Sequence, residues 1–325
     1  MELSCAFPPM PETAEYIALA ERLGYRRAWV FDTPALQLDV WMTLASAAER
    51  TERIILGPGV LVPSLRHPMV TASAIAHLSA LAPGRVEVGV GAGFTGRNAL
   101  GQRALRWSDV VGYARTVQAL LRGEPAEVEG ARVEMLHWAG QAPARPIEVP
   151  WKVAIAGPKG MAAARELGAG IFASRPPAGS SFDGFGSVTA MVSGTVLGPG
   201  ESAATPRVME AAGPGVAVRY HLLYEAGQRE ALAALPNGAR FIELVDALDD
   251  AERHVAMHSG HLSRLNDIDR QVVTPEALAL SPLLCAAEDV PAWIAGYEAM
   301  GVTELAFEPM GDIPAELERF ARAAG

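Results

Sequence analysis

The chain has 325 residues, half of them hydrophobic and a fifth charged, with a formal net charge of −10 at pH 7. A chain of this size buries roughly three quarters of its unfolded surface, which predicts an extensive core. The negative charge repels phosphate backbones and argues against a nucleic-acid partner. No apolar run approaches the roughly 18 residues of a membrane-spanning helix, and the first residues lack the features of a secretory signal. Two scattered cysteines, Cys5 and Cys285, provide neither a disulfide framework nor a zinc site, so we expect a cytoplasmic protein.

Short apolar segments alternate with helical segments through the first third of the chain. The predicted strands are Leu3–Ala6, Arg27–Phe31, Ile54–Leu61 and Arg85–Val90. The predicted helices are Thr13–Gly24, Asp39–Arg50, Met69–Leu81 and a fourth that starts near Ser108. Consecutive strand–helix units predict a parallel sheet, because each helix carries the chain back over the sheet.

The second half continues this order after a segment rich in proline and glycine, Gly123–Pro150, which contains a predicted hairpin at Val128–Val133. The later predicted strands are Lys152–Ala156, Ile171–Ala173, Ala190–Leu197 and Leu305–Glu308, and the last predicted helices are Pro291–Met300 and Pro314–Ala323. Residues 198–290 form a long, mostly helical insertion between strands seven and eight. We therefore predict one domain, residues 1–325, folded as a (β/α)₈ TIM barrel with its chemistry at the carboxyl ends of the strands. A doubly wound open sheet is the alternative.

The loop after the fourth strand has the spacing GxGxxG, at Gly91, Gly93 and Gly96. Three interpretations are open: a dinucleotide fingerprint, a tight turn at a barrel rim, or a loop whose missing side chains let a flat ring approach the backbone. The fingerprint is disfavoured because the unit is fourth in the chain and no acidic residue ends a second strand about 20 residues later. The following residues lack a helical stripe, so we expect no helix to begin at this loop.

Residues Leu56–Gly93 resemble one family closely. The segment LGPGVLVPSLRHPMVTASAIAHLSALAPGRVEVGVGAG follows the hallmark of the luciferase-like oxidoreductases, which bind a flavin or a deazaflavin in the mouth of a barrel. The resemblance implies a cis peptide between Gly59 and Val60 that backs the central flavin ring, and the alternative is an ordinary kinked strand beside a proline turn. It also implies that Gly91, Ala92 and Gly93 contact the flavin ring. The cofactor phosphate would be bound by the loop Gly157, Pro158, Lys159 and Gly160, and Ser174 and Arg175 are weaker candidates for the same phosphate.

Polar residues at strand ends are the candidates for chemistry. Asp32 ends the second strand, and we expect it either in the cofactor pocket, where it is a catalytic candidate, or as a strand-end cap. Arg66 and His67 either contact the cofactor or substrate or start a helix, and Phe7 and Phe94 complete the predicted substrate pocket. The GPKG loop at Gly157 is interpreted either as an anion site at a helix N-terminus or as a plain turn.

Two departures from the family pattern limit the mechanism. Deazaflavin-dependent relatives often have Asp-His where this chain has Asp32–Thr33, and those that oxidise sugars have a glutamate where this chain has Phe94. Phenylalanine cannot move a proton, so the sugar-dehydrogenase mechanism does not carry over.

The insertion contains histidines that we expect to serve a structural role. His254, His258 and His261 have the spacing of one helix face, but no HExxH motif or cysteine accompanies them, so we predict no metal site. His221 is a second catalytic candidate if the insertion folds over the barrel mouth.

The resemblance favours an oxidoreductase that acts as a monooxygenase on a small organic substrate and uses reduced FMN, which we expect a separate flavin reductase to supply. The alternative is hydride transfer with the deazaflavin coenzyme F420, and a third is a flavin-binding barrel without turnover. The family also implies a homodimer formed through the helices between Val40 and Leu81. The substrate is not predicted, because the loops that select it vary most within such folds.

Overall fold

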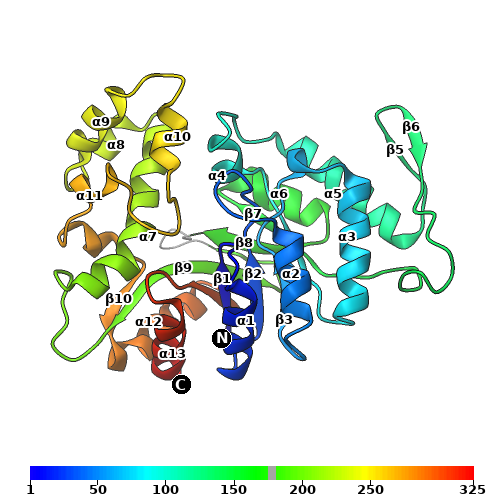
Figure 1. Ribbon diagram of the computed structural model, residues 1–325, viewed down its shortest axis with the longest axis horizontal. Coiled ribbons are helices and arrows are strands. Elements are labelled where there is room, and N and C mark those ends of the chain that lie inside the picture. Colours follow the sequence, from blue (N-terminus) through cyan, green and yellow to red (C-terminus); the bar gives the residue numbers. More distant parts are fainter. Residues whose placement is uncertain (175–180) are drawn as a thin grey trace.

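The computed structural model describes residues 1–174 and 181–325. Its main sheet contains the eight strands β1 (Glu2–Phe7), β2 (Arg27–Val30), β3 (Ile55–Pro58), β4 (Val88–Val90), β7 (Trp151–Ile155), β8 (Gly170–Ser174), β9 (Val188–Leu197) and β11 (Glu304–Glu308). They are parallel and run in the order β3-β2-β1-β11-β9-β8-β7-β4 (Figure 1).

The two ends of this sheet meet, which closes the barrel. The Leu56 amide of β3 donates to the carbonyl of Arg85 at 2.8 Å, and the Leu61 amide donates to the carbonyl of Gly89 at 2.8 Å. The predicted (β/α)₈ barrel is therefore confirmed, and the open-sheet alternative is excluded.

Helices surround the barrel, and several correspond to the predicted amphipathic segments. They are α1 (Thr13–Arg22), α2 (Val40–Ala48), α3 (Pro68–Leu81), α4 (Phe94–Asn98), α5 (Trp107–Arg122), α6 (Pro158–Glu166), α12 (Val290–Ala299) and α13 (Ile313–Ala324), with short 3₁₀ turns η1 (Pro63–Leu65) and η3 (Ala287–Asp289). The predicted hairpin is present as antiparallel β5 (Ala126–Val128) and β6 (Ala131–Val133), and it projects from the barrel on the side away from the insertion (Figure 1). No helix in the described part of the chain is long and apolar enough to cross a membrane.

Our expectation that no helix begins after the glycine loop is wrong, because α4 starts at Phe94. The residue before it, Gly93, has φ +76°, a left-handed conformation that glycine adopts without steric cost. This turn starts a helix too short to show a hydrophobic stripe, which is the signal we relied on.

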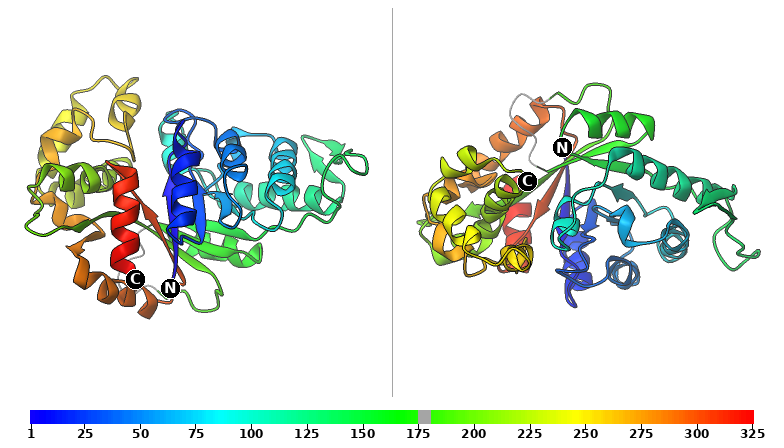
Figure 2. Two further views of the ribbon diagram at one scale, coloured as in Figure 1. Left: turned by 60° about the horizontal axis from the view of Figure 1, so that its bottom comes forward. Right: turned by 90° about the horizontal axis from the view of Figure 1, so that it is seen from above.

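The insertion folds around its own core beside the barrel (Figure 2). It contains α7 (Pro206–Glu225), α8 (Arg229–Ala233), α9 (Gly238–Asp246), α10 (Arg253–His258), α11 (Asp269–Val272) and η2 (Ala277–Leu280). It is not helical throughout, because residues Leu283–Ala286 form an additional strand, β10, that pairs in parallel with residues Gly194–Leu197 of β9. The sequence LLCA is a short apolar run, and periodicity alone does not distinguish such a run from buried helix.

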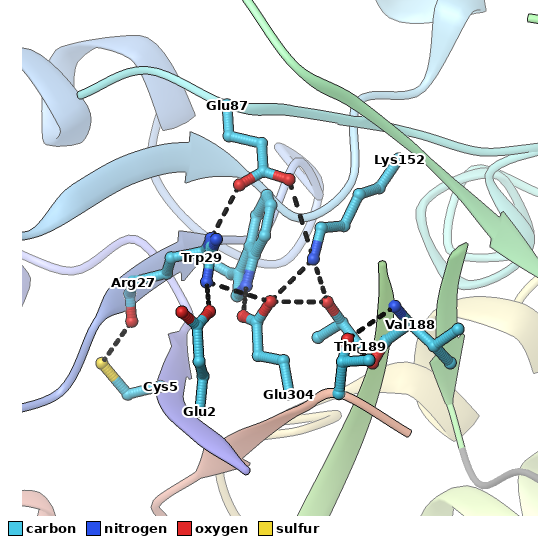
Figure 3. A network of polar contacts seen from close by, with 10 residues as sticks. Glu2, Cys5, Arg27, Trp29, Glu87, Lys152, Val188, Thr189 and Glu304 are labelled. Carbon is cyan, nitrogen blue, oxygen red and sulfur yellow. Dashed lines mark hydrogen bonds and ion pairs between the residues drawn. The ribbon is translucent and has the colours of Figure 1, made fainter. Parts of the chain in front are cut away.

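A buried network of charges fills the barrel at the amino ends of its strands (Figure 3). Lys152 is 0% exposed, and its Nζ lies 2.7 Å from Oε2 of Glu304, which is 1% exposed. The second carboxylate oxygen of Glu304 accepts from the Trp29 indole at 3.0 Å. Arg27 donates to Glu87 at 2.7 Å and lies 3.4 Å from Glu304. Since these residues come from β2, β7, β11 and the segment before β4, their pairing joins strands that are distant in the sequence.

The charges of this network stabilise one another's ionised forms. Burial opposes ionisation of Glu304, but Lys152 and Arg27 outweigh it, and the pKa of Glu304 lies below its ordinary value of 4.5. Breaking such a buried pair by removing one partner leaves an uncompensated charge in the core. Residues at this end of a barrel contribute stability, and chemistry takes place at the opposite end.

We predict that Lys152→Met lowers the free energy of unfolding by about 3–5 kcal/mol, because Glu304 loses its buried cation. Urea unfolding followed by circular dichroism measures the loss. Lys159→Met is the matched control, since Lys159 is the chain's other lysine and is exposed. A loss for Lys152→Met no larger than that of the control contradicts the role of the network.

The same network predicts a pH dependence. The folded-state pKa of Glu304 is lowered, so its stabilising contribution is present above pH 4.5 and is lost as the pH falls through the folded-state value. The difference in unfolding free energy between the wild type and Glu304→Gln should therefore shrink as the pH is lowered below 4.5. A difference that stays constant from pH 7 to acid contradicts this assignment.

Candidate functional site

The predicted site residues gather at the carboxyl ends of the strands, the rim where (β/α)₈ barrels carry their chemistry. Asp32 follows β2, Val60 follows β3 and Gly91 follows β4. Two of these loops touch, because Gly96 of α4 lies against the Asp32 backbone, where an added Cβ would be 3.2 Å from the carbonyl oxygen.

Asp32 and Arg66 form an ion pair at this mouth. Arg66 Nη1 lies 2.6 Å and 2.7 Å from the two carboxylate oxygens of Asp32, and the Val62 amide donates to Oδ2 at 3.2 Å. Arg66 Nη2 donates to Asp39 at 2.8 Å, and Asp39 in turn caps α2 through its other oxygen. Arg66 therefore joins the end of β2 to the start of α2.

The pKa values of the two carboxyl groups are shifted in opposite directions. Asp32 is 3% exposed, and burial raises its pKa even though Arg66 and the Val62 amide favour the carboxylate. For the half-buried Asp39, burial also opposes ionisation, but the hydrogen bonds from Arg66 and the helix amides prevail and lower its pKa. Both oxygens of Asp32 are engaged within the protein, so Asp32 acts here as an anchor for Arg66 and for the loop after β3.

Val60, just after β3, packs so closely against Gly91, just after β4, that no side chain fits at position 91. The peptide between Gly59 and Val60 is cis, as the resemblance implied. An added Cβ at Gly91 would lie 2.8 Å from Cγ2 of Val60 and 3.1 Å from Cβ of Ala154. Contacts within the chain therefore already require glycine at this position, and Ala92 is left half-buried at the rim.

An apolar floor lies inside the barrel beneath the mouth. It consists of Ala6, Trp29, Phe31, Phe172 and Ala306, with Val60, Ala154, Met191 and Leu262 packed against it. Leu262 belongs to the insertion, which thus reaches the interior of the barrel.

Phe7, predicted for the substrate pocket, lies on the other face of β1. Its ring centroid is 6.4 Å from that of Tyr16 in α1, within the main core. Neighbouring residues of a strand point to opposite faces, so Ala6 faces the floor and Phe7 faces the helices.

The predicted phosphate loop lies at the start of α6. Gly157 precedes the helix with nothing near the position of an added Cβ, Lys159 is exposed, and Gly160 is buried against Trp107. Pro158 occupies the first helical position, where proline is favoured.

The remaining rim candidates lie at the edge of the mouth. Ser174 is exposed at the end of β8, and Arg175 lies outside the described residues. His67 is exposed and caps α3, because its Nδ1 accepts from the Met69 amide at 3.1 Å. Phe94 is 40% exposed at the start of α4.

The insertion places its histidines differently from our prediction. They do not share one helix face, because α10 ends at His258 and His261 lies in the turn that follows Gly260, whose φ is +73°. His254 lies beside Gly101, whereas His258 and His261 are buried together with His221 of α7. Asp269 lies 2.8 Å from Nε2 of His221.

The chain thus belongs to the class of closed (β/α)₈ barrels, and its candidate binding residues lie around the mouth. A model of the luciferase-like monooxygenases matches residues 4–182, more than half of the chain. The chain belongs to this family, as its resemblance between Leu56 and Gly93 implied.

Curated relatives include enzymes named for the deazaflavin coenzyme. The chain is 36% identical over 179 residues to an F420-dependent glucose-6-phosphate dehydrogenase of Beutenbergia cavernae, covering 48% of this chain and 50% of that protein. It is 30% identical over 169 residues to a 5,10-methylenetetrahydromethanopterin reductase of Methanolobus tindarius, covering 50% of each. The chain thus spans about half the length of the curated relatives it matches.

Solved structures share the whole fold at lower identity. The coenzyme F420 dependent tetrahydromethanopterin reductase from Methanopyrus kandleri has a TM-score of 0.67 at 19% identity, covering 99% of this chain and 98% of that one. The oxygenating constituent of 3,6-diketocamphane monooxygenase from Pseudomonas putida, in complex with FMN, has a TM-score of 0.61 at 17% identity, covering 100% and 96%. These similarities establish the fold.

Sequence reasoning missed residues whose role depends on tertiary contacts. Asp39 was assigned only to a helix start, and nothing in its spacing shows that Arg66 links it to Asp32. Asp269 was not singled out, because it pairs with a histidine 48 residues earlier in the chain.

We predict that His67→Ala destabilises the protein by about 0.5–2 kcal/mol through loss of the α3 cap, and that His67→Asn restores most of this loss. Thermal and urea unfolding of the three proteins measure the effect. Equal stability of His67→Ala and the wild type would contradict the capping role.

Proposed function

We propose that this chain is an oxidoreductase that binds the deazaflavin coenzyme F420 at the barrel mouth and acts on a small organic molecule. The observation that carries the proposal is the 36% identity to an F420-dependent dehydrogenase, since the FMN-bound structure is similar only in fold. This reverses the preference for reduced FMN that the sequence motifs suggested.

The residues at the mouth fit such a cofactor. Val60, Gly91, Ala92 and Gly93 would contact a flat ring above the apolar floor, and the open space at Gly157 would admit a phosphate at the start of α6. The coenzyme supplies hydride chemistry, and the protein binds it, orients it and excludes water. Because Leu262 packs against the floor, we infer that ring binding displaces or repositions this side chain.

The substrate of the proposed reaction differs from the sugar phosphate named for the Beutenbergia relative. Thr33 and Phe94 replace the histidine and glutamate expected for sugar oxidation, and Asp32 is already paired with Arg66. Arg66, His67 and Phe94 remain the candidates for substrate contact, whereas His221 is buried in the insertion with its two ring nitrogens held by His261 and Asp269. We therefore propose a substrate whose reaction does not depend on a proton-moving side chain at positions 33 and 94.

A second candidate function is a monooxygenase that uses reduced FMN delivered by a separate flavin reductase. The family description and the FMN-bound structural neighbour favour it. A flavin-binding barrel without turnover is the third candidate.

Turnover assays distinguish these candidates. Under anaerobic conditions, the full chain should oxidise reduced F420, or reduce F420, with at least one member of a panel of small ketones, alcohols and enones. The matched assay supplies reduced FMN and oxygen to the same panel. Oxygenated products that depend on reduced FMN, with no F420 turnover, would overturn the proposal in favour of the second candidate.

We also propose that the chain forms a homodimer through α2 and α3. These helices lie side by side (Figure 1), and they leave large apolar side chains exposed, with Met42 77% and Val70 54% exposed. Exposed apolar side chains on two neighbouring helices support this proposal, because contiguous apolar patches mark interaction sites.

We predict that light scattering gives twice the mass of one chain, and that Met42→Glu combined with Val70→Glu gives a monomer. Leu136→Glu is the control, since Leu136 is 84% exposed but lies outside these helices. A monomeric wild type at micromolar concentration contradicts the proposal.

A further inference from the structure

Three buried histidines of the insertion bring their ring nitrogens together around Nδ1 of His261. Nδ1 of His261 lies 2.8 Å from Nδ1 of His221 and 3.4 Å from Nδ1 of His258. One nitrogen from each of the three rings lies within 4.8 Å of the others. The three residues are only 1–4% exposed, so bulk water does not compete for this point.

Two carboxylates hold the opposite nitrogens of these rings. Nε2 of His221 lies 2.8 Å from Asp269, and Nε2 of His258 lies 2.5 Å from Glu225. A carboxylate accepts a hydrogen bond and cannot donate one, so we assign the proton of each neutral ring to Nε2. The lone pairs of His221 and His258 are then left at Nδ1, directed toward His261.

When all three rings are neutral, the single proton on His261 Nδ1 cannot be donated fully to both of these lone pairs. His261 carries a single hydrogen at Nδ1 when neutral, whereas both His221 and His258 present a lone pair there. A cation at the centre accepts all three lone pairs at once. The carboxylate–histidine pairs match the outer-shell contacts that orient histidine ligands and raise their basicity at metal centres.

We propose that His221, His258 and His261 bind a divalent transition metal such as Zn²⁺, oriented by Asp269 and Glu225. Zinc–nitrogen bonds of about 2.0–2.1 Å in a tetrahedron place neighbouring nitrogens about 3.3 Å apart. The His258–His261 separation already has this value, and the His221–His261 pair needs to open by about 0.5 Å as the metal replaces the shared proton. Three protein ligands leave a fourth position for water or another small ligand.

The metal would join α7 to the end of α10 and to the turn that follows it. His221 lies on α7, His258 ends α10, and His261 precedes Leu262, which packs on the barrel floor. Gln37, in the loop after β2, also lies 3.5 Å from the carbonyl of His261. The site would therefore fix the turn that carries Leu262 at the barrel mouth, independently of which flavin the mouth binds.

Metal binding by the full chain, prepared without a histidine tag and stripped with a chelator, tests the proposal. We expect one equivalent of Zn²⁺ per chain by calorimetry and elemental analysis, a rise in the melting temperature with Zn²⁺, and the visible absorption of four-coordinate Co²⁺ in the substituted protein. His261→Asn should abolish saturable binding. His254→Gln is the matched control, because His254 lies in α10 outside the cluster, and it should bind as the wild type does.

A second variant separates loss of a ligand from loss of the fold. Asp269→Asn leaves all three ligands in place and should weaken Zn²⁺ binding by about 10–100-fold while the far-ultraviolet circular dichroism is unchanged. The proposal is overturned if the stripped wild-type chain shows no saturable binding of Zn²⁺ or Co²⁺. Unchanged stoichiometry and affinity in His261→Asn would overturn it equally.

Discussion

The buried pair of Lys152 and Glu304 is the interaction on which the barrel depends. Both charged groups are buried, so each requires the other as its partner. Together with Arg27, Glu87 and Trp29 they form one network of ion pairs and hydrogen bonds that connects strands from both halves of the chain. This network occupies the amino ends of the strands, and the floor above it is apolar. The barrel interior is thus filled with side chains at the amino ends of the strands, and the mouth at their carboxyl ends is left to bind a ligand.

Contacts within the chain also shape that mouth. Val60 packs so tightly against β4 that Gly91 cannot carry a side chain, and Arg66 secures Asp32 to the start of α2. Asp32 and Arg66, which the sequence suggests as candidates for catalysis or binding, are therefore already paired within the protein. The insertion adds Leu262 from above, so the mouth lies between a rigid barrel and a separately packed helical unit.

The fold could be predicted from the sequence because strand–helix alternation is a local signal, and the Leu56–Gly93 motif identified the family. Strand β10 and helix α4 were missed because four or five residues are too short to show a period. The site was predicted less completely, for a physical reason. Asp32 and His221 were recognised singly, but their partners Arg66 and Asp269 lie 34 and 48 residues away, and only folding brings them together.

We infer that the mouth of the barrel binds a deazaflavin in preference to FMN. Parallel equilibrium titrations of the full chain with F420, FMN and anaerobically reduced FMN, followed by fluorescence and absorbance, test it most directly. We expect F420 to bind at least about tenfold more tightly than either form of FMN, a difference of about 1.4 kcal/mol. Tighter binding of reduced FMN, or binding of none of the three, would contradict it.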